Sequence, residues 1–473
     1  MIAVVRRWLA ANRALLSNTS SLMGTTLVTS VLGLAFWGIA PAYFSSNAIG
    51  LAAAAIAAMM LIGQVSVLGL GTLLIGEFAR QQRRVASLIA TALIVAGTVG
   101  VILGVLFALC TPLLIPGLQP LGESVSSAAV FAAGVGLTAV TLVLDQAFVG
   151  LLRGGLQLGR NTILAVTKVG TVMIAGVLFK GAGGLAIYAA WGVGHIISLI
   201  GLTVFLVIKR QWPRVWRPRW GLLSGLRRAA LGHHALNLVQ QVPNTAFPLV
   251  VTAILSREMN AYFYYAWMIA SFAFFGLSSL TTVLYAVSAA NPAALAEKIR
   301  LTLRLSAGGG VLGVGIVLLG ADLIMAVLGH GDHGYVRYGA PSLRIIELGV
   351  FPLIVRTHYV AVSRIHGRLT RASLLIAAGG VLELGAAGLG AHAGGLTGLS
   401  EGWLIAVSVE AALMARTVHA AAITAGVPGR REAGERPARR PCPRRRDRRP
   451  DARACKKRSL RATLDPRCRR GDC

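Results

Sequence analysis

Six charged side chains lie inside long apolar stretches of this sequence: Asp145, Lys168, Arg356, Glu383, Glu410 and Arg416. A charge exposed to lipid costs about 3 kcal/mol in free energy, so we expect these groups to face an internal cavity or one another. A guanidinium offers a diphosphate a planar fork of N–H donors. Arg356 and Arg416 are therefore candidate contacts for an anionic group inside the membrane.

The other members of this set leave two interpretations open. Asp145 and Lys168 each lie about seven residues from the loop between their helices, so they are expected to pair across antiparallel neighbours or to contact a solute. Glu383 and Glu410 are candidates for taking up a coupling ion, either a proton or sodium. Buried ion pairs that only hold helices together explain the same residues.

Two arginine pairs follow the fourth and the tenth predicted helices. Arg153 and Arg160 form one pair, Arg364 and Arg371 form the other, and the members of each pair are seven residues apart. We expect these residues to gather an anionic group at the inner mouth of a passage. The general preference for arginine in cytoplasmic loops explains the pairs equally well.

The sequence contains no motif of a soluble enzyme. No P-loop, metal cluster or nucleophile triad is present, and the glycine run from Gly308 to Gly315 favours close helix contacts rather than nucleotide binding. His195 and His392 are expected to be packing or interface residues. We therefore expect no cofactor and no catalysis. The enzyme alternative, a membrane glycosyltransferase or polysaccharide polymerase, needs acids on an outer loop, and the first one, Pro41 to Gly50, has none.

The composition indicates which elements position these charges. The 473 residues are 55% hydrophobic and 13% charged, with a mean hydropathy of +0.69. Apolar stretches of roughly 20 to 28 residues have the length that a helix needs to cross a bilayer. We predict an all-α, polytopic membrane protein with about twelve transmembrane helices. They lie near 20–40, 48–76, 86–110, 126–151, 161–179, 184–208, 231–255, 260–286, 302–328, 341–362, 372–391 and 397–424.

The loops after even-numbered helices carry most of the basic residues. Positive loops resist translocation across the membrane, so these loops are expected in the cytoplasm. Both termini are then cytoplasmic, and the protein is expected in the cell membrane. The basic loops contain Arg80, Arg83 and Arg84; Arg153 and Arg160; Lys209, Arg210, Arg214, Arg217, Arg219, Arg227 and Arg228; Lys298 and Arg300; and Arg364, Arg368 and Arg371.

The chain is predicted to contain five segments. Residues 1–17 form a cytoplasmic amphipathic segment, 18–208 a first six-helix bundle, 209–230 a basic linker, 231–425 a second six-helix bundle and 426–473 a disordered basic tail. The tail holds 18 Lys and Arg against 6 Asp and Glu. This excess of basic residues supplies much of the formal net charge of +29 of the chain. Because the other basic residues follow the loops, the charge does not indicate nucleic-acid binding.

The two predicted bundles resemble each other. The arginine pairs recur at an offset of about 210 residues, as do Gly69-Leu70 and Gly276-Leu277. Six helices is an even number, so the repeats run parallel and are related by an axis along the membrane normal. Two like bundles can rock about a central site and expose it to each side in turn. The sequence therefore favours a carrier that works by alternating access.

Three stretches, residues 21–80, 143–170 and 359–380, carry a resemblance to a known family. The motif positions of the first stretch are occupied by Phe44, Gly50, Gly69, Leu70, Gly71 and Arg80. Over roughly residues 15–425 the sequence resembles the oligosaccharide and polysaccharide flippases of the multidrug/oligosaccharidyl-lipid/polysaccharide (MOP) exporter superfamily. The resemblance implies a MATE-like fold of two pseudo-symmetric six-helix bundles. Many such flippases have fourteen helices, so the last pair is absent here.

The resemblance implies movement of lipid-linked oligosaccharide precursors across the cytoplasmic membrane for cell-surface polysaccharide synthesis. It implies as partners the lipid-linked substrate, membrane lipids and a coupling ion, proton or sodium, with no nucleic acid. A cation-coupled multidrug exporter with the same fold is the alternative. A cavity for cations usually needs carboxylates in the first half, where only Asp145 lies inside a span, so an anionic or neutral substrate is favoured.

Overall fold

The computed structural model describes residues 13–80, 84–179, 181, 183–210, 218, 220, 227–290, 295–366 and 368–423. The chain divides into two units, Met1–Gly426 and Val427–Cys473, and all of the described residues belong to the first. The predicted basic tail, most of the N-terminal amphipathic segment and most of the basic linker lie outside the described residues.

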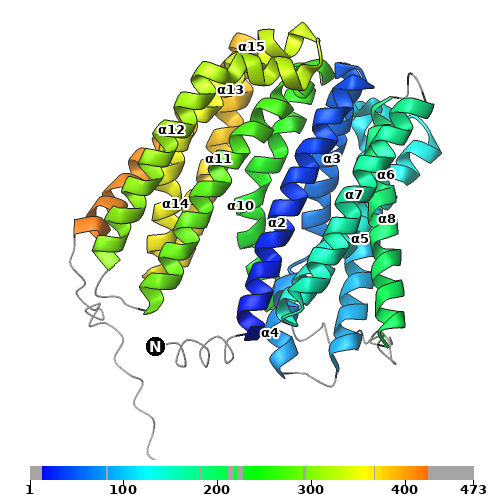
Figure 1. Ribbon diagram of the computed structural model, residues 1–473, viewed down its shortest axis with the longest axis horizontal. Helices are drawn as coiled ribbons and strands as arrows, with labels where there is room; N and C mark the ends of the chain where they lie inside the picture. The colour runs from blue at the N-terminus through cyan, green and yellow to red at the C-terminus, as the bar shows by residue number, and fades with distance from the viewer. Residues whose placement is uncertain are drawn as a thin grey trace, which may run out of the picture. The chain divides into compact units, whose positions relative to one another are not determined.

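The described part of the first half contains seven α-helices (Figure 1). They are α2 (Arg13–Ile39), α3 (Ser46–Ser66), α4 (Leu70–Arg80), α5 (Val85–Leu114), α6 (Val125–Gly150), α7 (Gly154–Leu178) and α8 (Gly184–Ile208). A short 3-10 helix, η1 (Ala40–Ala42), connects α2 to α3, and a second, η3 (Pro116–Leu121), connects α5 to α6. Pro41 and Pro116 each stand at the start of a 3-10 helix, between predicted spans.

The second predicted span, 48–76, is interrupted between α3 and α4. Leu68 (φ 50°) and Gly69 (φ 72°) both adopt left-handed backbone conformations there. Glycine adopts such angles readily, whereas a leucine does so only when its surroundings impose them. The prediction of one continuous helix was wrong. The residues on both sides of Leu68 and Gly69 are apolar, so the hydrophobic pattern gives no sign that the helix is interrupted there.

The described part of the second half contains six α-helices and one π-helical turn. They are α10 (Arg227–Ile254), α11 (Arg257–Ala290), α12 (Leu295–Gly329), the π turn η5 (Tyr335–Gly339), α13 (Ala340–Leu348), α14 (Val350–Ile365) and α15 (Leu369–Ile423). The segment that ends at Leu348 and the helix α14 meet at Gly349 with a bend of 41°. They form one bent span, which corresponds to the predicted span 341–362.

Helix α15 contains two traverses joined by a kink. Gly394 and Gly395 leave helical geometry, Gly395 with a φ of 61°. The two limbs then run side by side: a Cβ atom on Gly390 would lie 2.0 Å from the carbonyl oxygen of Gly398. Only glycine permits so close a backbone approach. The two limbs match the last two predicted spans.

Eight of the described helices are long and apolar enough to cross a membrane, or nine if the bent pair counts as one span. Helix α15 counts once among these although it contains two limbs, and the helices α10 and α11 occupy the seventh and eighth predicted spans. The described residues contain no strand. The predicted class, an all-α polytopic membrane protein with a MATE-like arrangement, is confirmed, and the comparisons below support the arrangement.

Apolar side chains separate into those that face outward and those buried between helices. Leu319 of α12 is 90% exposed and Leu113 of α5 is 86% exposed, as expected for side chains that face lipid. Helix α3 is buried along most of its length, including the small residues from Ala52 to Ala58. Small residues permit close helix contact in membranes. Helix α3 packs against α6 and α8 of its own half and against α10 and α11 of the other.

The ends of the helices fall into two sets, because successive spans alternate in direction. One set, which we term the basic end, includes Arg84, Arg153, Lys209, Lys298 and Arg364. The opposite end includes η1, η3 and the Gly394–Gly395 kink. The described residues of the basic loops thus fall at one end of the bundles, as the alternation predicts.

Candidate functional site

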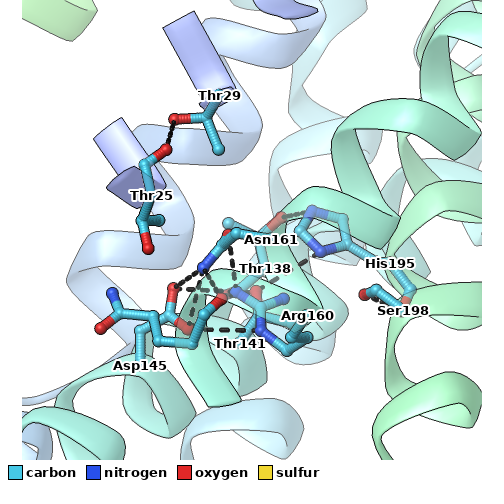
Figure 2. A network of polar contacts seen from close by, with 10 residues as sticks. Thr25, Thr29, Thr138, Thr141, Asp145, Arg160, Asn161, His195 and Ser198 are labelled. Carbon is cyan, nitrogen blue, oxygen red and sulfur yellow. Dashed lines mark hydrogen bonds and ion pairs between the residues drawn. The ribbon is translucent and has the colours of Figure 1, made fainter. Parts of the chain in front are cut away.

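The first cluster of buried charges joins α6 to α7 (Figure 2). Arg160 Nη2 donates hydrogen bonds of 2.8 Å to both carboxylate oxygens of Asp145, and Arg160 Nε donates a third bond of 3.3 Å. Asn161 Nδ2 donates to the same carboxylate at 3.3 Å. The Arg160 side chain is 1% exposed and that of Asp145 is 20% exposed. We term these three residues the first-half cluster.

The short connection between α6 and α7 determines this pairing. Only residues 151–153 separate the two helices, and Leu152 takes a φ of 55° to reverse the chain. Asp145 lies five residues before the end of α6 and Arg160 six residues after the start of α7, so the two side chains stand at the same level. Lys168 lies about 12 Å further along α7. The expected pairing of Asp145 with Lys168 is wrong, because α7 begins seven residues earlier than predicted.

Lys168 is a buried cation, with a residue exposure of 7%. Its Nζ atom lies 4.1 Å from the centroid of the Trp191 ring and 5.6 Å from that of Phe36. Among the described residues, no carboxylate oxygen lies close enough to the Lys168 ammonium, within 4.0 Å, to form an ion pair. A cation–π contact stabilises a desolvated ammonium by about 2 kcal/mol, less than the several kcal/mol that burial of the charge costs. The ring contacts therefore do not fully offset the cost of burying the Lys168 charge.

His195 of α8 extends the polar network of α6. Its ring nitrogens lie 3.5 Å from Thr138 Oγ1 and 3.4 Å from Thr141 Oγ1, and Ser198 donates a hydrogen bond to its carbonyl oxygen (Figure 2). These long contacts and its 3% exposure agree with the expected packing role. Arg160 Nη1 is buried beside this network without a hydrogen-bond partner in the described part of the chain.

The second cluster of buried charges joins α14 to both limbs of α15. Arg356 Nη1 donates to Glu383 Oε1 at 2.6 Å and lies 3.6 Å from Glu410 Oε2. The side chains are 14%, 3% and 2% exposed, in that order. Both oxygens of Glu410 are buried without a hydrogen-bond partner among the described residues. These three residues, the second-half cluster, contain two acids for one base.

Trp403 completes the second-half cluster, and the sequence reasoning missed it. Its indole Nε1–H donates to Glu383 Oε2 at 2.9 Å, and the residue is 2% exposed. The ring fills space left by Gly349, since a Cβ there would lie 2.3 Å from Trp403 Cη2. A buried indole N–H requires a hydrogen-bond acceptor, and this requirement is the signal in the sequence that could have pointed to Trp403. The sequence alone does not identify which acceptor it finds.

The other predicted site residues lie apart from the two clusters. Arg153, Arg364 and Arg371 are exposed, and Arg416 is exposed on the second limb of α15. Their contact with a substrate stays a prediction. Arg160 differs from them because it is buried in the first-half cluster, and the longer α7 places it inside a helix rather than in a loop.

A further acid of the second half lies outside both clusters. Glu347 of α13 is 1% exposed, and its Oε2 atom has no hydrogen-bond partner in the described part of the chain. Arg344, on the same helix, pairs instead with Asp322 of α12 at 2.7 Å, where both side chains are well exposed. The structure does not bring these groups together with Arg356.

Sequence comparison identifies no relative: no family model matches the chain, and no curated protein matches it. Comparison of structures finds solved chains with a similar fold. An inward-facing conformation of a multidrug resistance MATE family transporter of the MOP superfamily has a TM-score of 0.65 and 15% identity, over 84% of this chain and 98% of that one. An outward-facing conformation of such a transporter has a TM-score of 0.57 and 16% identity, over 87% and 97%.

A third solved structure is a MOP superfamily transporter from Pyrococcus furiosus, for which reverse polarity of the binding pocket suggests a different function. Its TM-score is 0.57 and its identity 16%, over 87% of this chain and 97% of that one. Each comparison spans nearly the whole of the known chain. The fold is that of MATE family transporters of the MOP superfamily. Membership of the flippase subfamily stays a prediction.

Proposed function

We propose that this protein is a membrane transporter that carries an anionic lipid-linked oligosaccharide across the bilayer by alternating access between its two halves. The observation that carries the proposal is Lys168. A buried ammonium without an acidic partner among the described residues destabilises a fold, and an anion that binds there offsets this cost. The diphosphate of a lipid-linked sugar is such an anion.

The fold supports the proposal at the level of transport. The MATE transporters that it resembles include both inward-facing and outward-facing conformations. The exposed arginines Arg153, Arg364 and Arg371 lie at the basic end, which the positive-inside rule assigns to the cytoplasm. In this proposal they attract the diphosphate at the inner mouth, and Lys168, Arg356 and Arg416 contact it further on. The protein then lies in the cell membrane with both termini in the cytoplasm.

Glu383 and Glu410 supply a driving force in this proposal. The two carboxylates share one guanidinium, so the second-half cluster carries one negative charge in excess when all three groups are ionised. A proton or a sodium ion at Glu410 removes that excess. Because its oxygens lack hydrogen bonds among the described residues, Glu410 is the better placed of the two to take up a cation. Asp145 is engaged by Arg160 and contributes less.

A multidrug exporter is the second candidate, and the second-half cluster favours it. Its excess acid suits a cationic solute, as the excess base around Lys168 suits an anionic one. The membrane-embedded polymerase or glycosyltransferase has less support, because Glu383 and Glu410 lie within spans rather than on an outer loop.

The test compares a deletion strain with strains that express variants. Deletion should retain lipid-linked oligosaccharide on the cytoplasmic leaflet and deplete surface polysaccharide. Arg356→Ala should lower export at least about tenfold, the effect of losing one charge-assisted contact, while the protein still inserts at normal levels. Arg344→Ala is the matched control, because its ion pair with Asp322 is exposed. Normal surface polysaccharide in the deletion strain contradicts the proposal, and loss of resistance to cationic drugs favours the exporter.

A further inference from the structure

Three side chains of α11 donate hydrogen bonds to backbone carbonyl groups of the first half. Arg257 Nε donates to the Gly117 carbonyl of η3, and Asn260 Nδ2 donates to the Gly50 carbonyl of α3 at 2.8 Å. The Tyr265 hydroxyl donates to the Trp37 carbonyl at the end of α2. We term these six residues the interhalf closure. All three acceptors come from the opposite end of the bundles, away from the basic end.

The interhalf closure lies on the approximate symmetry axis of the two halves. Gly50 and Asn260 are 210 residues apart, which is the offset of the internal repeat. The helices α3 and α11, each the second span of its half, meet so closely that a Cβ on Gly50 would lie 1.6 Å from the carbonyl oxygen of Arg257. Separation of the two halves at this end breaks this contact, because no side chain lies between the two backbones.

Helix α11 also contacts the second-half cluster through aromatic rings. Trp267 lies 5.3 Å from Trp403, centroid to centroid, with the rings at 79°. Phe274 lies 6.0 Å from the same ring. Trp403 in turn donates to Glu383, the acid that binds Arg356. One residue therefore contacts α11, the charge cluster and the bend at Gly349 together.

The same helix joins the interhalf closure to the first-half aromatic residues. Trp37 lies 4.6 Å from Tyr264 and 6.2 Å from Tyr265. Trp37 also meets Phe36 at 5.1 Å, the ring beside Lys168. The aromatic run of α11, from Tyr262 to Trp267, thus contacts residues that neighbour both candidate sites.

We propose that α11 couples the Arg356–Glu383–Glu410 cluster to the interhalf closure, with Trp403 as the positioning residue that joins them. When Glu383 leaves Arg356 for a substrate anion or a coupling cation, Trp403 loses its fixed acceptor and its packing on Trp267 loosens. Helix α11 then releases the three carbonyl groups, which water can solvate at little cost, and the opposite end opens. This inference rests on the proposed transport cycle, yet its test needs no substrate.

The test measures the accessibility of a single cysteine beneath the interhalf closure. Ala54 lies one turn beyond Gly50 on the same face of α3 and is 0% exposed. Ala54→Cys is made in a chain whose own cysteines, Cys110, Cys442, Cys455, Cys468 and Cys473, are replaced by serine. A membrane-impermeant maleimide is added to the side of the membrane that the opposite end faces. Complete labelling after denaturation shows that each variant is present in equal amount.

Asn260→Ala removes a direct bond of the closure and should raise the labelling rate of the introduced cysteine about tenfold. Trp403→Phe keeps an aromatic ring but removes the bond to Glu383, and should raise the rate by a similar factor. Tyr188→Phe is the matched control: it removes one buried hydrogen bond of 2.8 Å, to the Phe131 carbonyl, in helices that do not include α11. Its rate should stay within about twofold of the parent.

Two outcomes overturn the proposal. An unchanged rate in Asn260→Ala shows that the closure does not limit access, and a raised rate in Asn260→Ala alone shows that Trp403 is not coupled to it. Non-additivity separates positioning from general loosening: Glu383→Met leaves the Trp403 indole without its acceptor, so adding Trp403→Phe to Glu383→Met should change the rate by less than about twofold, since the two residues act through one contact. If these expectations hold while surface polysaccharide is normal in the deletion strain, the coupling stands and the proposed substrate does not.

Discussion

The two halves hold their buried charges in opposite ways. In the first-half cluster the carboxylate of Asp145 is engaged by Arg160 and Asn161, and the Lys168 ammonium lies against aromatic rings with no acidic partner among the described residues. In the second half a single base, Arg356, is shared by two acids. Halves that correspond in span order thus carry excess charge of opposite sign. Within the proposed function, the excess base of the first half joins Arg356 in binding the anion, and the excess acid of the second half takes up the cation.

Loss of Arg160 tests whether the first-half cluster serves structure. Arg160→Ala leaves the largely buried carboxylate of Asp145 without its base, and should lower the free energy of unfolding by about 3 kcal/mol. The measurement is the thermal stability of the detergent-purified protein. Asp145→Asn combined with Arg160→Gln should recover most of that loss. A stable Arg160→Ala protein contradicts a structural role for this pair.

Loss of Lys168 tests whether the excess base serves transport. Lys168→Met keeps the apolar stem and removes the charge, so stability should rise or stay unchanged while export falls at least about tenfold. Lys168→Arg keeps the cation over Trp191 and should retain part of the activity. Export assays and thermal stability are measured on the same preparations. A loss of stability that accounts for the loss of export removes Lys168 from the proposed substrate contacts.

Added volume at Gly379 tests the geometry of the second-half cluster. A Cβ at this position would lie 2.2 Å from Glu410 Oε1, so Gly379→Ala should displace that carboxylate. We expect a loss of about 1–3 kcal/mol in stability, as in other overpacked sites, and a changed dependence of transport on the coupling ion. Gly385→Ala is the control, because nothing lies within 4 Å of a Cβ there.

Loss of Arg371 should have the smallest effect. At the repeat offset it corresponds to Arg160, yet it is exposed at the basic end. Arg371→Ala should leave thermal stability within about 0.5 kcal/mol of the parent and reduce export only about twofold. A large loss of stability in Arg371→Ala would falsify the view that Arg371 and Arg160, which occupy equivalent positions in the two halves, have different roles.

The fold class and the spans followed from the sequence because apolar length and loop charge are local properties. The buried charges were also found, since any charge within a long apolar stretch is conspicuous. Their partners were not: Asp145 pairs with Arg160 because α7 starts at Gly154, a boundary that the apolar pattern does not mark. The break at Leu68 was missed for the same reason.

Trp403 and Asn260 were not predicted as functional residues. Each has an ordinary type for its position, and its role depends on what lies opposite it in space: a carboxylate from another limb, or a backbone carbonyl 210 residues away. Such long-range contacts leave no mark in the local pattern of a single sequence. Only the acceptor requirement of the Trp403 indole gave a hint, without naming Glu383.

The glycines of the α15 hairpin have one more consequence. A Cβ on Gly402 would lie 2.2 Å from the Ala386 carbonyl oxygen, and one on Gly390 would meet Gly398 as closely, so the limbs have no room to slide. Glu383 and Glu410 sit one on each limb, so the close backbone packing holds their Cα atoms at a nearly fixed separation. The ion pair with Arg356 of α14 then breaks through rotation of the Glu383 side chain or through movement of α14.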